Sequence, residues 1–142
     1  MAFALGPAMR PEDLSGRLHA LSIQVLVLVA SLPHTIQSRG AFEQICRAAP
    51  NASDNYRSAC RGRSRKEFVA RLGVALDESD ETVRWLQVIR DAGLAPSDRV
   101  TALLKEAIEL RAILAASYKT SKRNLRALEA RRSTRQKRRP NH

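Results

Sequence analysis

The sequence predicts an all-α protein: an antiparallel up-and-down four-helix bundle with a basic C-terminal extension. Four long segments place apolar residues at steps of three and four, the repeat of a helix with one buried face. Most of the six Gly and six Pro residues lie between these segments, where helices end. A chain of 142 residues has the length of about one domain with one core. Because no single stripe can bury itself, the four segments are expected to pack on one another.

The chain is expected to begin with a flexible leader over 1–12, followed by the bundle over 13–125 and a basic tail over 126–142. The first helix is predicted over 13–32, where a stripe keeps the helical step: Leu14, Leu18, Leu21, Val25, Leu28 and Leu32. Further apolar residues widen this face almost all round, which indicates a helix that is either central or shared with a neighbouring subunit. The run over 18–32 is too short, and too interrupted by polar residues, to be expected to span a bilayer.

The second and third helices are predicted over 41–60 and 65–92, after a loop over 33–40. Their inward stripes contain Phe42, Ile45, Ala52, Tyr56 and Ala59, and then Phe68, Leu72, Leu76, Val83 and Leu86. Gly62 marks the break between them, and Ser64 with Glu67 has the spacing of a capping box. The two segments therefore predict an antiparallel helical hairpin with a short basic turn.

The fourth helix is predicted over 97–125, after the breaks at Gly93 and Pro96. Its inward stripe contains Val100, Leu104, Ala107, Leu110 and Leu114. The same step continues through Tyr118, Ser121, Leu125 and Leu128. The helix is therefore expected to project past the bundle before it dissolves within 131–142.

The net charge of +11 is concentrated at the C-terminal end. Residues 119–142, the basic arm, hold ten Lys or Arg and one acid, whereas residues 1–118 hold fifteen basic and thirteen acidic residues. Such an arm is the electrostatic footprint of nucleic acid or an anionic surface; a solubilising, partly disordered tail is the alternative. The candidate phosphate-binding residues of the arm are Lys119, Lys122, Arg123, Arg126, Arg131 and Arg132. Because only Tyr118 lies nearby, binding should depend on phosphate contacts rather than on base stacking.

A second basic group surrounds the turn of the predicted hairpin. It consists of Arg57, Arg61, Arg63, Arg65 and Lys66. Guanidinium groups and the free backbone amides at the start of a helix both suit phosphate oxygens. The alternative is that Arg57 and Arg61 only stabilise the negative C-terminal end of the second helix. The sequence leaves both interpretations open.

The residues of catalytic and metal sites are missing in the required spacing, so no enzyme activity, metal or cofactor is expected. No Glu is followed by His three residues later, as a di-iron bundle site would need, and His19, His34 and His142 are scattered. Neither Cys46 nor Cys60 has a neighbouring His, and on one helix they would lie about 21 Å apart, beyond a disulfide. The acidic group over 77–81 is expected to face arginines, with Arg47 opposite Asp77 and Glu78 across the hairpin.

An ordered set of short motifs resembles the signature of a known family. The motifs are Asn55-Tyr56-Arg57-Ser58-Ala59, Arg63-Ser64, Glu67-Phe68, Glu78-x-Asp80-Glu81-Thr82 and Trp85-Leu86, then Glu106-Ala107-x-Glu109-Leu110, Ile113 and Lys119-Thr120-x-Lys122. They resemble the four-helix-bundle proteins encoded by intervening sequences in bacterial large-subunit ribosomal RNA genes, over roughly residues 14 to 124. The resemblance implies an up-and-down bundle that assembles as a homopentamer. A more distant relative, the accessory protein of diversity-generating retroelements, is a basic pentamer that binds nucleic acid and a reverse transcriptase.

Two hypotheses for function follow. The first is a non-enzymatic, cytoplasmic accessory protein that binds nucleic acid, with RNA as the expected ligand, as an oligomeric ring through phosphate contacts. The second is a protein-interaction scaffold whose arm docks an acidic partner such as a reverse transcriptase. The composition of the arm favours the first, and the near-neutral body permits the second. Neither hypothesis involves a membrane.

Overall fold

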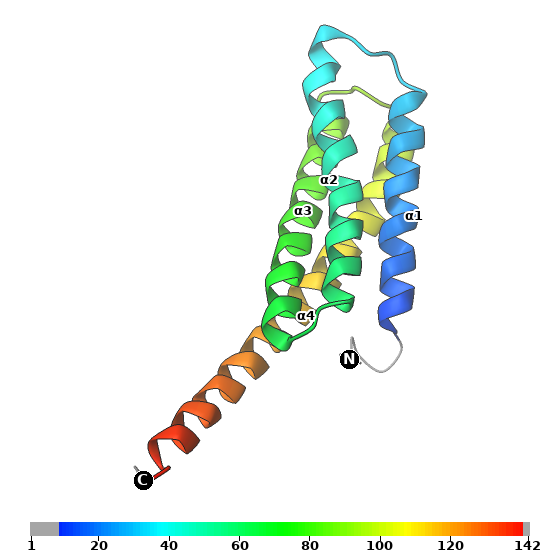
Figure 1. Cartoon of the computed structure of the whole chain (residues 1–142). Helices are drawn as coiled ribbons and strands as arrows, with labels where there is room; N and C mark the ends of the chain where they lie inside the picture. The colour runs from blue at the N-terminus through cyan, green and yellow to red at the C-terminus, as the bar shows by residue number, and fades with distance from the viewer. Residues whose placement is uncertain (1–8, 141–142) are drawn as a thin grey trace.

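The structure is a computed structural model that describes residues 9–140 of the chain. It contains α1 (Pro11–Ala30), α2 (Ile36–Cys60), α3 (Arg65–Asp91) and α4 (Ser97–Lys137), and no strand within the described residues (Figure 1). The predicted all-α class and the four-helix bundle are confirmed. Most of the predicted leader lies outside the described residues, which start at Met9, just before α1.

The helices run alternately up and down, and each packs on the next one along the chain (Figure 1). The most extensive packing joins α2 to α3, as the predicted hairpin requires. The bundle closes where α4 packs against α1, and this seam has the least packing of the four helix–helix contacts. One side of α1 is therefore less covered than the faces of the other helices.

The core is aliphatic and alanine-rich, as the low aromatic content implies. Its largest fully buried side chains are Tyr56, Leu14, Ile45, Leu72, Leu86, Ile89, Leu110, Leu114, Val25, Val83, Val100 and Thr82. Burying one such Val, Leu or Ile side chain contributes about 1.5–3 kcal/mol to folding. Leu76, predicted to point inward with Leu72, is only partly buried and packs on the edge of this core.

Helix α2 begins five residues earlier than predicted, at Ile36. Thr35 caps it: the Ser38 backbone N–H donates to Thr35 Oγ1 at 3.2 Å, and the Thr35 N–H donates to Ser38 Oγ at 2.9 Å. These two hydrogen bonds satisfy backbone amides at the start of α2 and stabilise the helix there. The polar residues of this stretch gave no sign of a helix start. Gly40, expected at the end of a loop, lies inside the helix.

The turn between α2 and α3 forms as the sequence predicts. The Glu67 backbone N–H donates to Ser64 Oγ at 3.1 Å, so Ser64 is the N-cap of α3. The Glu67 carboxylate accepts from the N–H of Arg63 at 3.2 Å rather than from that of Ser64. Gly62 permits the close turn, because a Cβ there would lie 3.0 Å from the Ala59 carbonyl oxygen.

Helix α4 continues twelve residues beyond its predicted end at 125 and stops at Lys137. It leaves the other three helices and projects alone (Figure 1). Every residue from Glu129 to Pro140 is exposed. The expectation that the chain dissolves from 131 is therefore wrong up to Lys137. The physical reason is composition, because Leu, Arg, Ala, Glu, Gln and Lys are strong helix formers and no Gly or Pro occurs between Pro96 and Pro140.

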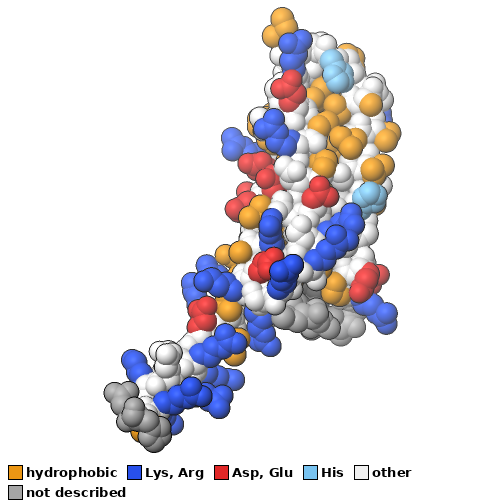
Figure 2. All heavy atoms as spheres, in the orientation of Figure 1, with side chains coloured by type: hydrophobic (Ala, Val, Ile, Leu, Met, Phe, Trp, Pro, Cys, Tyr) orange, Lys and Arg blue, Asp and Glu red, His pale blue; other side chains and the backbone are white. Residues whose placement is uncertain are grey.

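Helix α1 is apolar on its outer side as well as on the side that faces the core. By length and composition alone it could cross a membrane, contrary to the expectation for 18–32. Its inward stripe, which includes Leu14, Leu18 and Val25, is buried against the other helices, the position of a core helix. Its outer side is also apolar: Ile23 is 47% exposed and Val27 60%. Figure 2 shows hydrophobic side chains gathered over the C-terminal half of α1.

Candidate nucleic-acid interface

The two predicted basic groups lie at the same end of the bundle. The turn between α2 and α3 is located where α4 leaves the other helices (Figure 1). Lys and Arg side chains dominate the projecting part of α4, whereas the bundle carries both signs of charge (Figure 2). The fold therefore brings the start of the basic arm and the hairpin turn to one region of the molecule.

The first part of the arm forms a groove beside a fixed tyrosine. Tyr118 rests on α3 at Gly73, where a Cβ would lie 3.1 Å from Tyr118 Cε2. Lys122 Nζ lies over the ring, 5.4 Å from its centroid, in a cation–π contact. The groove, of about 490 Å³, is lined by Tyr118, Lys119, Lys122, Arg123 and Arg126. Four predicted residues are thus brought together around one aromatic ring, and the close approach at Gly73 was not foreseen.

The second part of the arm carries further arginines beside the predicted Arg131 and Arg132. A hollow of about 620 Å³ lies in this part of the arm. It is lined by the predicted Arg132 and by Arg135, Gln136, Arg138, Arg139 and Pro140. The sequence does indicate them, because Leu128, Arg132, Arg135 and Arg139 continue the helical step of α4, with arginine in place of leucine from 132 onward.

The charge of the arm is not neutralised by ion pairs within residues 9–140. Four ion pairs occur among the described residues, and none of them involves a Lys or Arg of the arm. The only acid of the arm, Glu129, is exposed and takes part in none of them. The arm therefore presents a dense set of free cations to solvent, the arrangement that attracts a polyanion.

The cations at the hairpin turn are in a different situation. Arg57, Arg61, Arg63, Arg65 and Lys66 are all exposed. Arg57 and Arg61 line a hollow of about 300 Å³ together with Glu12 and Cys60, so a carboxylate is already nearby. The Glu67 N–H at the start of α3 donates to Ser64 Oγ, and the Arg63 N–H of the turn donates to the Glu67 carboxylate. Phosphate binding by the exposed side chains and stabilisation of the α2 C-terminus remain equal alternatives.

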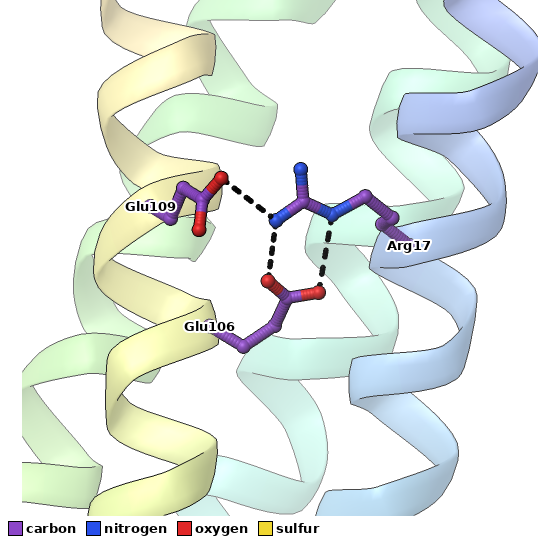
Figure 3. Close-up of polar contacts among 3 residues, drawn as sticks. All are labelled: Arg17, Glu106 and Glu109. Carbon is purple, nitrogen blue, oxygen red and sulfur yellow. Dashed lines mark hydrogen bonds and ion pairs between the residues drawn. The ribbon is translucent and has the colours of Figure 1, made fainter.

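Three arginines of the bundle, Arg17, Arg90 and Arg111, have carboxylate partners. The Arg17 guanidinium on α1 is held by Glu106 and Glu109 on α4 (Figure 3). Its Nε donates to Glu106 Oε2 at 3.1 Å, and its Nη2 bonds the other oxygen of Glu106 and lies 3.3 Å from Glu109 Oε1. The hydrogen bond to Glu106 raises the pKa of Arg17 above its usual value. This ion pair bridges the seam between α1 and α4.

The acidic group of α3 is paired differently from the prediction. Asp80 accepts a hydrogen bond from Arg111 Nη1 at 2.9 Å, which joins α3 to α4. The expected ion pair between Arg47 and Asp77 or Glu78 is not formed. Partial burial raises the pKa of Glu78, and the negative charges of Glu81 and Asp77 raise it further. Arg47 acts only as a more distant charge that lowers this pKa.

Residues that could support catalysis or metal binding do not converge in the described part of the chain. No group of three or more His, Cys, Asp and Glu there could hold a metal ion. His19 lies on α1, His34 contacts the Val29 carbonyl oxygen at 3.0 Å, and His142 lies outside the described residues. Cys46 and Cys60 are free, and burial raises the pKa of both thiols, which disfavours the reactive thiolate.

Comparison with known proteins connects the bundle to a family. A solved structure of a protein of unknown function from the S23 ribosomal protein family of Bacteroides thetaiotaomicron superposes with a TM-score of 0.71. It is 21% identical, and the alignment covers 78% of this chain and 99% of that one. No curated protein matches the sequence. Residues 14–116 match the description of 23S rRNA-intervening sequence proteins. This match spans most of α1, all of α2 and α3 and about the first half of α4, and the chain belongs to the 23S rRNA-intervening sequence protein family.

Proposed function

We propose that this protein is a non-enzymatic, cytoplasmic accessory protein that binds nucleic acid through the phosphate backbone. The single observation that supports this most strongly is the unpaired charge of the arm: it has ten Lys or Arg and one acid, and none of the ion pairs among the described residues involves the arm. Lysine and arginine that neutralise phosphates release bound counterions, and this release drives sequence-independent binding. The choice of RNA as the ligand rests on the family description alone.

Assembly into a closed ring would strengthen this binding. The resemblance to the pentameric relatives implies five subunits, and the structure offers apolar surface at the seam of α1 and α4. Ile23, Val27 and Ile108 are 47%, 60% and 40% exposed, and a hollow of about 300 Å³ lies between Ile23, Val27 and Leu103. Several arms acting on one polyanion would raise their effective local concentration. Light scattering at micromolar concentration tests the ring, and a monomer would contradict it.

A salt series tests nucleic-acid binding. The full chain is titrated into a labelled RNA oligonucleotide, and fluorescence anisotropy is measured between low and physiological salt. Affinity should fall steeply with salt, because each neutralised phosphate adds about 0.7–0.9 to the slope of log affinity against log salt. A truncation after Ser121 should lose most of the affinity and keep the helical circular-dichroism spectrum of the bundle, because the buried stripe ends near Ser121.

Two outcomes would change the assignment. Undiminished binding by the truncated protein would place the site on the bundle, where the hairpin turn would be the next candidate. No binding by the full chain at low salt would contradict the proposed function. The hypothesis of a scaffold that docks an acidic protein, such as a reverse transcriptase, would then be the one to pursue.

A further inference from the structure

The part of α4 that leaves the bundle has dimensions that restrict its ligand. Residues 119–137 of the arm are helical, and at about 1.5 Å per residue they form a rod about 28 Å long. A helix with its side chains is roughly 10–12 Å wide. From Glu129 onward no residue of this rod is covered by another part of the described chain. A polyanion can therefore approach residues 129–137 from any side, whereas Ser121 and Leu125 hold one side of the first part of the rod against the bundle.

The cations of the rod are arranged on two opposite flanks. Lys119, Lys122, Arg123 and Arg126 are separated by three and four residues and share the first flank. Arg132 and Arg135, three residues apart and nearer the tip, share the second flank, and Arg139, just beyond the helix end, lines the same hollow. At about 100° per residue, the centres of the two flanks are roughly 160° apart around the axis. Figure 2 shows basic side chains along both edges of the projecting part.

The two sides between these flanks differ in chemistry. One side presents Ala127, Arg131 and Thr134, which lie four and three residues apart and are all exposed. The other presents Leu125, half-buried against the bundle, and Glu129, four residues further on. The one acid of the arm thus lies opposite the side with the short Ala127 and Thr134 side chains, which is the side that nucleic acid could approach most closely.

We propose that the arm inserts lengthwise into the major groove of double-stranded DNA in the B form. Its two flanks would each contact the phosphates of one strand, and the side with Ala127, Arg131 and Thr134 would face the base edges. The B-form major groove is about 12 Å wide and admits a helix. The major groove of an RNA duplex is too deep and narrow, and a single strand lacks the two opposed backbones. The insertion rests on nucleic-acid binding proposed above, and it selects duplex DNA over the RNA that the family description suggests.

Affinities for matched ligands test the insertion. The full chain is titrated into a labelled DNA duplex of about 16 base pairs, about twice the length of the rod at roughly 3.4 Å per base pair. An RNA duplex of the same sequence and the two single strands are measured at the same salt. The duplexes carry the same number of phosphates, so simple charge attraction predicts similar affinities, whereas insertion predicts a preference for DNA of about tenfold or more. Equal affinities, or a preference for RNA or for a single strand, would overturn insertion and leave nucleic-acid binding intact; no binding to any ligand would contradict both.

Two variants with the same change in charge test whether the side with Thr134 faces the groove. Thr134 is exposed on the arm, and Gln37 is exposed at the start of α2, at the opposite end of the bundle. Thr134→Glu should weaken DNA binding by about tenfold, because it places a carboxylate against the base edges and phosphates. Gln37→Glu, far from the arm, should weaken binding by about twofold or less, through distant repulsion alone. Circular dichroism checks that both variants keep the helical content, and equal losses would contradict the insertion.

Discussion

The part of α4 inside the bundle and the part that projects from it share one helical repeat, but the repeat faces the core in the first part and solvent in the second. From Val100 to Leu114 the stripe at steps of three and four is aliphatic and buried in the bundle. From Arg132 to Arg139 the same stripe carries arginine and is exposed. The difference teaches that periodicity predicts where a helix runs, whereas the residue type on the stripe predicts whether the helix faces a core or a solvated partner.

The family match divides the helix at nearly the same place. It ends at residue 116, before the basic arm begins at Lys119. Family membership therefore describes the bundle, and the case for the arm depends on its own charge and geometry. Variants that compare the bundle with the arm can separate folding from binding.

The largest expected difference is in stability. Leu72 is fully buried in α3, whereas Leu128 lies on the same kind of stripe in the arm and is only half-buried. Leu72→Ala should lower the free energy of unfolding by about 2–5 kcal/mol, since it leaves a cavity in a packed core. Leu128→Ala should lower it by less than about 1 kcal/mol. Urea denaturation followed by circular dichroism measures both, and similar losses would mean that the arm is part of the core.

The fold could be predicted from the sequence wherever the apolar stripe reports a buried face. The α2–α3 hairpin is the clearest case, because Gly62 and Ser64 also specify where one helix stops and the next begins. The start of α2 was missed because its cap, Thr35 with Ser38, lies in a polar stretch before Gly40 that is typical of a loop. The length of α4 was missed because the apolar stripe stops at Leu128, although the helix-forming composition continues.

The candidate site was predictable only in part, for a related reason. Charge density along the sequence identifies the arm without any knowledge of the fold. The contact between Tyr118 and Gly73, and the Arg17 pair with Glu106, join helices that are far apart in the sequence. Such contacts depend on how far each helix is rotated about its own axis. An apolar stripe defines this rotation only coarsely, so it does not predict which individual side chains meet. The expected Arg47 pair failed in the same way, since Asp80 with Arg111 formed instead.

The next expected difference concerns the two basic groups. Replacing Arg131, Arg132 and Arg135 by Ala removes three unpaired cations from the arm, and should lower affinity for an oligonucleotide by about tenfold or more at physiological salt. Replacing Arg57, Arg61 and Arg63 by Ala removes the same charge from the turn, where Glu12 lies near two of them. The turn variant should therefore lose less, about threefold. Fluorescence anisotropy compares the two, and a larger loss for the turn variant would move the main contact to the bundle.

A smaller effect is expected at the ion pair across the seam. Glu106→Gln removes the carboxylate that binds Arg17 through two nitrogens, but both side chains are about a third exposed. The cost should be about 0–1 kcal/mol, because solvent screens such pairs. Asp80→Asn, which breaks the more exposed pair with Arg111, is the matched control and should cost less. Thermal unfolding measures both variants, and a loss above about 2 kcal/mol for Glu106→Gln would indicate that the seam depends on this pair.

The smallest effect is expected at Glu78 and depends on pH. Its pKa is raised in the folded protein by partial burial and by the charges of Glu81 and Asp77. The ionised carboxylate is therefore less favourable in the folded state than in the unfolded chain, so its ionisation lowers stability as pH rises through the folded-state pKa. Glu78→Gln should raise the melting temperature at pH 7, by less than about 4 °C. Below the pKa of an unfolded Glu, about 4.3, both proteins carry a neutral side chain and the difference should disappear. Melting curves across this pH range decide the matter; a variant that is less stable than the parent at pH 7 would mean that the distant charge of Arg47 outweighs burial and the two neighbouring acids.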